Sequence, residues 1–321
     1  MNLPENLQIV GGSIIGNEHV RLSRNNQDAW VVRQDEDRAV AIVSDGCGSG
    51  RFSEVGARVG ANLLAGIIYR KLGEPMFRLD RLASEPANCL LEQSRQEVLE
   101  RIGDLSRQLV LITFGQCVSN ILAEGISPRR LKPPTTNEIT GSGIRSSFSE
   151  AVTDFFLFTV IGFFATRRSV GLFHAGDGIT AWNDEITLLR SEGNAPEYIG
   201  YELTGSSLFA QSPNAFHFNL DRLSAIEDFR NAFLGTDGAI DLHEAAAGTF
   251  PGKTELIGPI AGLLKDDRMF SNPDSLRRHL AKAAQNIHRP DWEARRMVKS
   301  PGLLPDDTTL ILIRSVLEEN R

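Results

Sequence analysis

The feature that most constrains this chain is an apolar, β-branched run that ends on an acidic residue and a glycine-rich loop. The stretch VAIVSDGCGSG occupies residues 40–50, and four of the five residues after Asp45 are Gly or Ser. This pattern predicts a strand that presents a carboxylate at its end, where glycine lets the backbone come close to a bound group. Asp-Gly is also the commonest hairpin-turn signal, so one occurrence does not separate a site from a turn.

The same arrangement recurs at three other apolar segments. AFLGTDG reaches Asp237, VGLFHAGDG reaches Asp177, and in PDDTTLILIR the pair Asp306 and Asp307 precedes the apolar run. Antiparallel strands could bring these ends together. Clustered carboxylates repel one another unless protons or cations neutralise them, and hard divalent cations accept oxygen ligands. We therefore expect a metal site built from carboxylates.

Five short motifs, taken in order, resemble the metal-dependent protein phosphatases of the PP2C type. They are NQDA, SDGCGSGRFSEVGA, HAGDG, GTDGAID and PDDTTL. The resemblance is closest to the bacterial branch with a DGxGS loop, and it covers most of residues 9–72 and 152–315. The residues themselves support a mixed α+β fold. The resemblance implies a layered αββα sandwich of two antiparallel sheets flanked by helices, with one domain over residues 1–321 and a mainly helical and loop variable segment at about 75–150.

The resemblance also implies a metal-assisted hydrolysis of phosphoserine or phosphothreonine in proteins. Two Mg²⁺ or Mn²⁺ ions would share Asp45, with the Gly46 carbonyl on one ion and Asp237 and Asp306 on the other. A water between the ions would attack phosphorus in line, so the reaction needs no protein nucleophile. This agrees with a chain that shows no convincing Ser-His-Asp or Cys-His arrangement.

Three further carboxylates belong to the expected metal site. Asp28 lies in the first motif, after Gln27 where the family has Glu, so one carboxylate is lost. The resemblance places Asp177 near a possible third, looser ion. Asp241 follows Asp237 by four residues, which turns both carboxylates towards one region if the segment is helical.

The phosphate anchor departs from the family pattern. The arginine expected five residues before Asp28 is Ser23, and the neighbouring cations are Arg21 and Arg24. A guanidinium suits phosphate because its fork of donors can bind two oxygens. In extended backbone, residues 21 and 23 face the same side, which favours Arg21 over Arg24.

A general acid for the leaving group is harder to assign. Some relatives have a histidine two residues after the first Asp, where this chain has Cys47. His19 is the nearest substitute in the preceding loop. A water bound to a metal ion could also serve.

Composition excludes several other classes of protein. The apolar content of 41% and charged content of 23% are ordinary for a globular protein, and the net charge of −7 argues against a nucleic-acid surface. Three scattered cysteines without a CxxC favour a reducing compartment. No secretory signal or membrane span is expected. We expect a cytoplasmic protein whose partners are a phosphorylated protein substrate and a kinase counterpart.

Several local expectations follow from residue patterns. The segment from Ser53 to Gly73 predicts a helix with Ser53 as its N-cap, in which Gly56 and Gly60 allow close packing. Other expectations are a buried strand over Val152–Ala165 that could break near Gly162, a hairpin turn at Asp177-Gly178, a loop over Ser127–Ser149 and a flap over 191–215.

Two alternative functions stay open. A non-catalytic phosphoprotein-binding module of the same fold is supported by Gln27 and by the displaced arginine, and opposed by the retained Asp positions. A carboxylate-built Ca²⁺-binding structural domain would need neither hydrolysis nor a phosphate-holding loop.

Overall fold

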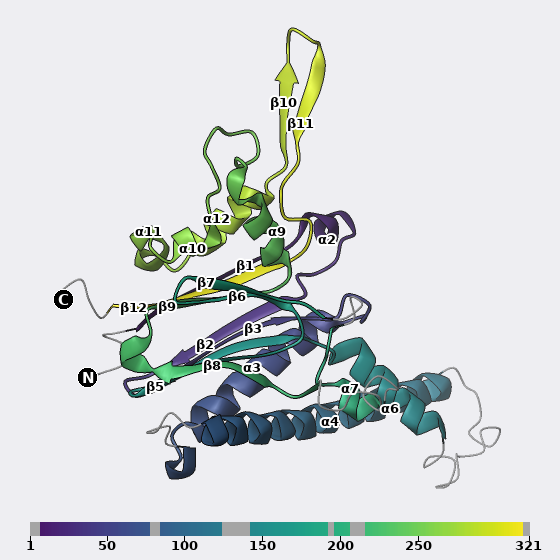
Figure 1. Cartoon of the computed structure of the whole chain (residues 1–321). Helices are drawn as coiled ribbons and strands as arrows, with labels where there is room; N and C mark the ends of the chain where they lie inside the picture. Colours follow the sequence, from purple (N-terminus) through teal and green to yellow (C-terminus); the bar gives the residue numbers. More distant parts are fainter. Residues whose placement is uncertain (1–6, 78–83, 124–141, 192–195, 206–215, 317–321) are drawn as a thin grey trace.

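Two five-stranded antiparallel sheets pack face to face and carry helices on both outer sides (Figure 1). The computed structural model describes residues 7–77, 84–123, 142–191, 196–205 and 216–316, with the backbone alone for 114–123 and 142–146. This arrangement confirms the αββα sandwich that the motif resemblance implies. Within the described residues, no helix has the length and apolar character needed to cross a membrane.

The first sheet, sheet A, holds the two ends of the described chain side by side. Its strands, in spatial order, are β1 (Leu7–Ile14), β12 (Thr308–Ser315), β9 (Asn231–Gly235), β6 (Gly178–Trp182) and β7 (Glu185–Leu189).

The second sheet, sheet B, contains the strand that ends on the glycine-rich loop. Its strands, in spatial order, are β2 (Asp28–Gln34), β3 (Arg38–Asp45), β4 (Val160–Thr166), β5 (Ser169–Ala175) and β8 (Asn219–Ala225). A separate ribbon pairs β10 (Ile287–Asp291) with β11 (Arg296–Ser300).

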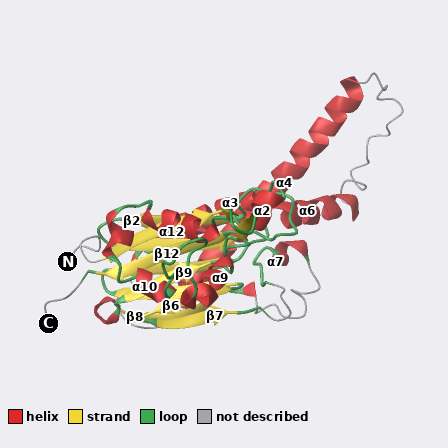
Figure 2. Cartoon of the chain, turned by 90° about the horizontal axis from the view of Figure 1, so that it is seen from above, coloured by secondary structure: helices red, strands yellow, loops and turns green. Residues whose placement is uncertain are grey.

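The helices form two outer layers and one short connection. Sheet B is covered by α3 (Ser53–Lys71), α4 (Ser84–Ala123), α6 (Ser142–Phe155) and α7 (Tyr201–Thr204). Sheet A is covered by α9 (Gly238–Glu244), α10 (Ile260–Leu263), α11 (Asp267–Ser271) and α12 (Ser275–Ala284). Between β1 and β2 lies α2 (Asn17–Arg21). Figure 2 shows α4 running well beyond the sheets.

Three apolar layers hold this stack together. One lies between the sheets and includes Val43, Phe163 and Ile311. The other two lie between each sheet and its helices. Because both faces of each sheet are covered, the central strands are apolar on both sides, as the run VAIV in β3 and the buried strand β12 show.

The expected hairpin at Asp177-Gly178 is wrong. Strand β5 pairs with β4 and β8 in sheet B, whereas β6 pairs with β7 and β9 in sheet A. The chain therefore crosses from one sheet to the other at Gly176 and Asp177. Two glycines make this crossing possible, since Gly176 and Gly178 have φ values of +97° and +142°. The Asp-Gly pair marks a crossover that brings Asp177 to the ends of both sheets.

The expected strand over Val152–Ala165 is wrong in its first part. Residues up to Phe155 belong to helix α6, and β4 begins only at Val160, with Gly162 inside it. The expected strand included the last residues of α6 because they run without a polar break into the buried apolar residues Phe156, Leu157 and Phe158 before β4. The loop expected over Ser127–Ser149 is likewise helical from residue 142, while 124–141 lies outside the described residues. Most of the expected flap, at 192–195 and 206–215, lies outside them too.

Two glycines bring helix α3 close to the end of α6 and to the segment that leads into β4. A Cβ on Gly56 would lie 1.7 Å from the Phe155 carbonyl oxygen, and one on Gly60 would lie 2.1 Å from the ring of the buried Phe158. Gly66 differs, because a Cβ there would meet only the end of the Arg33 side chain, 3.8 Å away. Helix α3 thus contains one glycine, Gly60, that has no space for a side chain, and another, Gly66, that has.

We expect opposite effects from alanine at these two glycines. Gly60→Ala should lower the free energy of unfolding by about 1–3 kcal/mol, because the added methyl group overpacks a closed contact. Gly66→Ala should raise it by about 0.5–1 kcal/mol through helix propensity. Urea unfolding of both variants measures the difference, and equal effects of the same sign would contradict the packing described for α3.

Candidate active site

The acidic ends of the strands meet at one edge of the sandwich. Asp28 begins β2 and pairs in register with Asp45, which ends β3. From sheet A come Asp237, directly before α9, and Asp306, two residues before β12. Antiparallel pairing of β12 with β9 places the last two at the same end, where the Thr236 N–H donates to the Thr309 carbonyl.

The buried pair of Asp28 and Asp45 is the centre of this cluster. Asp28 is only 3% exposed, and its Oδ2 accepts a hydrogen bond of 2.7 Å from the Thr236 hydroxyl. Its Oδ1 is buried without a hydrogen-bond partner. Burial raises the pKa of Asp28 to about 8. Burial, together with the charges of Asp28, Asp237 and Asp306, also raises the pKa of Asp45 well above its ordinary value.

The carboxylates around this pair are perturbed in the same direction. Asp237 accepts a hydrogen bond of 2.7 Å from the Gly238 N–H at the start of α9, yet burial and the charge of Asp306 raise its pKa to about 6. Burial raises the pKa of Asp177. Asp241 lies one helical turn beyond Asp237, and burial followed by the charges of Glu244 and Asp306 raises its pKa. The structure therefore places these predicted carboxylates in one region, where their negative charges affect one another.

This donor set fits hard divalent cations. Protons or cations must offset the repulsion among the carboxylates, and a buried oxygen of Asp28 has no donor. The predicted ligands, which are carboxylates and the Gly46 carbonyl, all offer oxygen, which suits Mg²⁺ or Mn²⁺. Gly46 lies against Ser53, since a Cβ on it would be 2.6 Å from the Ser53 carbonyl oxygen. Only glycine fits that approach.

Asp307 joins the two sides of the site, a role that the sequence reasoning missed. It is 2% exposed, and its two oxygens accept hydrogen bonds from the N–H groups of Gly16, at 2.7 Å, and Gln27, at 2.5 Å. Its Oδ2 lies 2.8 Å from His19 Nδ1, and His19 Nε2 lies 3.7 Å from Asp306 Oδ1. The available signal was the second Asp of the PDD motif.

The ligand-type atoms of His19, Asp306 and Asp307 lie within 4.8 Å of one another. Two backbone N–H groups already occupy the oxygens of Asp307, so we assign it to positioning the loops and the His19 ring. Asp306, by contrast, is half exposed and remains available as a ligand.

Gln27 has a structural partner in place of the family's metal-side Glu. Its Nε2 donates a hydrogen bond of 2.6 Å to the Ser53 hydroxyl, and its carbonyl accepts one from the Gly46 N–H. The expectation that Ser53 caps α3 is therefore wrong. Ser53 is the first helical residue, and its hydroxyl binds Gln27.

The two candidate phosphate anchors are held differently. Arg21 lies in helix α2 and pairs with Glu18, with 66% of its side chain exposed. The extended backbone that would favour Arg21 is therefore absent there. Arg24 donates to the Gly48 carbonyl of the glycine-rich loop at 3.3 Å. Of the two, Arg24 is the one that contacts this loop.

Cys47 occupies the place of the histidine found in some relatives. It is buried, and its Sγ lies 3.1 Å from the Ser49 hydroxyl. Tyr198 lies next to Cys47. Burial, followed by the nearby Cys47 thiol, raises the pKa of the Tyr198 hydroxyl. Tyr198 is a further residue that the sequence reasoning missed.

Comparisons with known proteins point to one family. The family model of protein phosphatase 2C matches residues 15–286. A bacterial serine phosphatase carrying a single arginine substitution superposes with a TM-score of 0.50 at 12% identity, over 97% of this chain and 99% of the other. The catalytic domain of the serine threonine protein phosphatase PstP, in complex with two manganese ions, gives 0.44 at 14% identity, over 97% and 99%. No curated protein matches the sequence.

The raised pKa values predict how stability depends on pH without metal. Asp28 keeps its proton in the folded state up to about pH 8, whereas in the unfolded chain it loses the proton near the ordinary aspartate pKa of 3.8. The folded state thus binds more protons between these values, and its stability should fall as pH rises through this window. Burial lowers the pKa of His279, which adds an opposite slope in the acidic part.

The comparison of wild type with Asp28→Asn isolates the carboxyl contribution. Metal-free wild type should lose melting temperature from pH 5 to 8 relative to Asp28→Asn, since His279 contributes equally to both proteins. Differential scanning calorimetry in EDTA measures this difference. Parallel pH profiles would show that Asp28 does not retain its proton.

Proposed function

The chain belongs to the protein phosphatase 2C family and is a protein serine/threonine phosphatase, and we propose that it hydrolyses phosphoserine and phosphothreonine with a water activated between two divalent cations. The observation that carries the mechanism is the cluster of Asp28, Asp45, Asp237 and Asp306, whose mutual repulsion requires neutralisation. A phosphoprotein is therefore the substrate class, and a protein kinase is the enzyme class that supplies it. We place this activity in the cytoplasm.

The residues suited to hold the cations surround Asp45. Asp45, the Gly46 carbonyl, Asp237 and Asp306 would hold the two cations, with Asp177 and Asp241 available for a third. When bound, Mg²⁺ or Mn²⁺ acidifies a water and offsets charge on the phosphoryl oxygens. Asp28, whose carboxyl group is buried and accepts a hydrogen bond from Thr236, would add to the negative charge beside Asp45 when it is ionised.

His19 is our candidate for protonating the leaving group. Its Nδ1 lies 2.8 Å from the buried Asp307 carboxylate, at ion-pair distance but without hydrogen-bond geometry. Nε2 is the atom left to give a proton to the serine or threonine oxygen as the bond to phosphorus breaks. The same nitrogen lies 3.7 Å from Asp306 Oδ1, so the proton would be delivered beside the cation site.

Arg24 is our candidate for holding phosphate. Its guanidinium donates a hydrogen bond to the Gly48 carbonyl of the glycine-rich loop, and among the described residues no carboxylate pairs with it. Arg21 is already paired with Glu18. A guanidinium near Gly48 can bind phosphate oxygens and offset charge in the transition state.

The non-catalytic alternative keeps one supporting observation. Gln27 replaces an acidic residue and is used to bind Ser53. Asp45 and Asp237 nevertheless lie at the site with raised pKa values, which a module that only binds phosphoproteins would not require.

Asp45→Asn tests the cation assignment. It should lower turnover of p-nitrophenyl phosphate with Mn²⁺ by several orders of magnitude, because the shared ligand is lost. Calorimetry should show weakened Mn²⁺ binding, while Asp104→Asn, an exposed change on α4, should leave both unchanged. Wild-type turnover that persists in EDTA, or wild-type Mn²⁺ affinity in Asp45→Asn, would contradict the mechanism.

Arg24→Ala and Arg21→Ala form a matched pair for the phosphate anchor. Arg24→Ala should raise KM for a phosphopeptide by roughly ten- to a hundredfold, since loss of a charge-assisted hydrogen bond costs about 1.5–3 kcal/mol. Arg21→Ala should change KM by less than about threefold, because surface ion pairs contribute little. A larger effect at Arg21, with Mn²⁺ binding intact in both variants, would reverse the assignment.

A further inference from the structure

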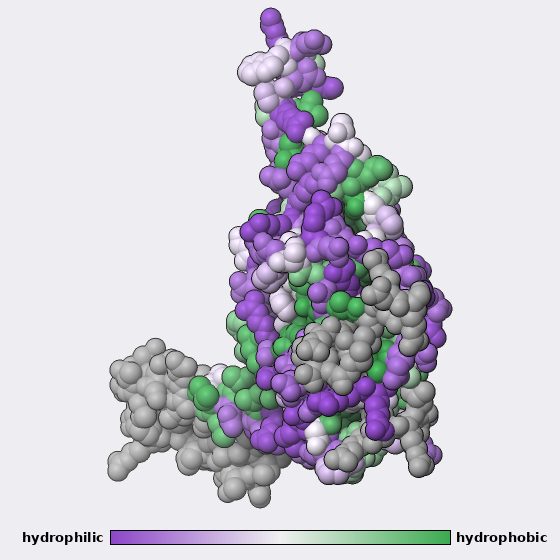
Figure 3. Space-filling model, turned by 90° about the vertical axis from the view of Figure 1, so that its left-hand side faces the viewer, coloured by the Kyte–Doolittle hydropathy of each residue, from purple (hydrophilic) through white to green (hydrophobic). Residues whose placement is uncertain are grey.

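A projecting ribbon extends from the layer of helices above sheet A. Strands β10 and β11 pair antiparallel from Ile287 with Ser300 to Asp291 with Arg296, and we call residues 287–300 the arm. Figure 1 shows the arm standing away from both sheets beside α2 and α9, and Figure 3 shows it as a narrow column clear of the body. The arm therefore contributes no layer to the sandwich.

Three large apolar side chains of the arm are exposed. Trp292, at its tip, is 84% exposed, and Met297 and Val298 are 62% and 41% exposed. A two-stranded ribbon without a packed face is only marginally stable in water. Exposed tryptophan is also among the residues that contribute most to protein interfaces when a partner covers them. These features favour a surface that a partner covers.

The charge of the arm selects an acidic partner. Arg289, Arg295, Arg296 and Lys299 outnumber its two acidic residues, although the whole chain carries −7. Within the part of the chain that the structure describes, these four cations form no ion pair. They are available to a partner and attract negative charge from solution.

The root of the arm is hydrogen-bonded to α2, the short helix that carries His19. The side chain of Asn286 donates to the side chain of Asn17, the first residue of α2, at 3.1 Å, and accepts from the Gly302 N–H at 3.1 Å. Asn17 in turn donates to the Ala284 carbonyl at 2.9 Å. After β11 the chain runs directly to Asp306. A partner on the arm would thus lie beside the active site.

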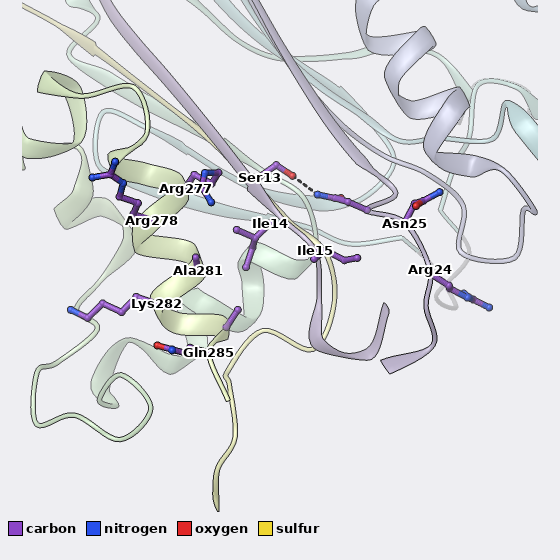
Figure 4. Close-up of a pocket in the computed structure, with 12 residues that line it drawn as sticks. Ser13, Ile14, Ile15, Arg24, Asn25, Arg277, Arg278, Ala281, Lys282 and Gln285 are labelled. Atoms are coloured by element: carbon purple, nitrogen blue, oxygen red, sulfur yellow. Dashed lines mark hydrogen bonds between the residues drawn. The ribbon is translucent and has the colours of Figure 1, made fainter. Parts of the chain in front are cut away.

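A cationic groove continues from the root of the arm towards the site. It is a cavity of about 900 Å³ between α12 and the loop of Arg24, with Ser13 and Ile14 of β1 at its floor (Figure 4). Arg277 and Arg278 line it and share a single carboxylate, Asp274. Its positive charge is therefore only partly neutralised, and Arg24 connects it to the glycine-rich loop.

We propose that the arm and this groove form a docking surface for an acidic segment of the phosphoprotein substrate. Trp292 would provide an apolar anchor at the tip, and the free cations of the arm would attract the segment and set its direction. This inference rests on the proposed phosphatase function, because the partner is its substrate. It adds a reason why a protein substrate would be preferred over a small phosphate ester.

Two arm variants and one control test the docking surface. The arm variants are Arg295→Glu with Arg296→Glu, and Trp292→Ala. The control is Arg58→Glu with Arg101→Glu, which makes the same charge change at exposed residues of α3 and α4, in the opposite helical layer. Each protein is assayed with Mn²⁺ on phosphorylated casein, an acidic phosphoprotein, and on p-nitrophenyl phosphate, which is too small to reach the arm.

We expect both arm variants to lower kcat/KM for casein by about three- to tenfold at low salt, with turnover of p-nitrophenyl phosphate and the melting temperature unchanged. The loss in the charge variant should shrink as salt is raised, because the interactions are screened. The control should match wild type on both substrates.

Three results would overturn the docking surface. They are arm variants that equal wild type on casein, an equal loss on p-nitrophenyl phosphate, or an equal loss in the control. Failure of the proposed function would be recognised by a different result, in which the wild-type protein shows no Mn²⁺-dependent turnover of p-nitrophenyl phosphate. In that case fluorescence anisotropy of labelled phosphorylated casein tests the arm alone, and equal affinity for wild type and arm variants would reject it.

Discussion

The repulsion between Asp28 and Asp45 is the constraint on which the rest of the structure depends. The register of β2 and β3 places these residues opposite each other, so neither can leave without breaking the ladder. The fold stabilises them with contacts that cross between the sheets. Thr236, from sheet A, donates to Asp28, and Asp307 accepts from the N–H of Gln27, next to Asp28. The remaining repulsion is left for protons or, in the proposed mechanism, for cations to offset.

Much of the architecture could be predicted because strand ends and motif order are local features of the sequence. The runs before Asp45 and after Asp307 are strands, and α3 follows the glycine-rich loop. The partner of a strand is not a local feature. The segment around Asp177 therefore suggested a hairpin, although its two strands belong to different sheets. The end of helix α6 suggested a strand because it continues directly into the apolar residues before β4.

The site shows the same division. Carboxylates that end strands could be identified from the sequence, and the structure brings them together. Residues that act through long-range contacts could not, as with Asp307, whose partners Gly16 and Gln27 are almost 300 residues away in the chain. The preference for Arg21 assumed an extended loop, and the helix α2 removes that assumption. No element was predicted from the sequence for the arm, whose two strands are seen only in the structure.

The central claim is that metal ions replace protons in the carboxylate cluster. Isothermal titration calorimetry of Mn²⁺ binding, in two buffers of different ionisation enthalpy at pH 7, counts the protons exchanged. The pKa of Asp28 near 8, together with the raised pKa of Asp45, predicts net proton release that declines above about pH 8. Identical apparent enthalpies in the two buffers, with Mn²⁺ bound, would mean that no proton leaves and would contradict the account.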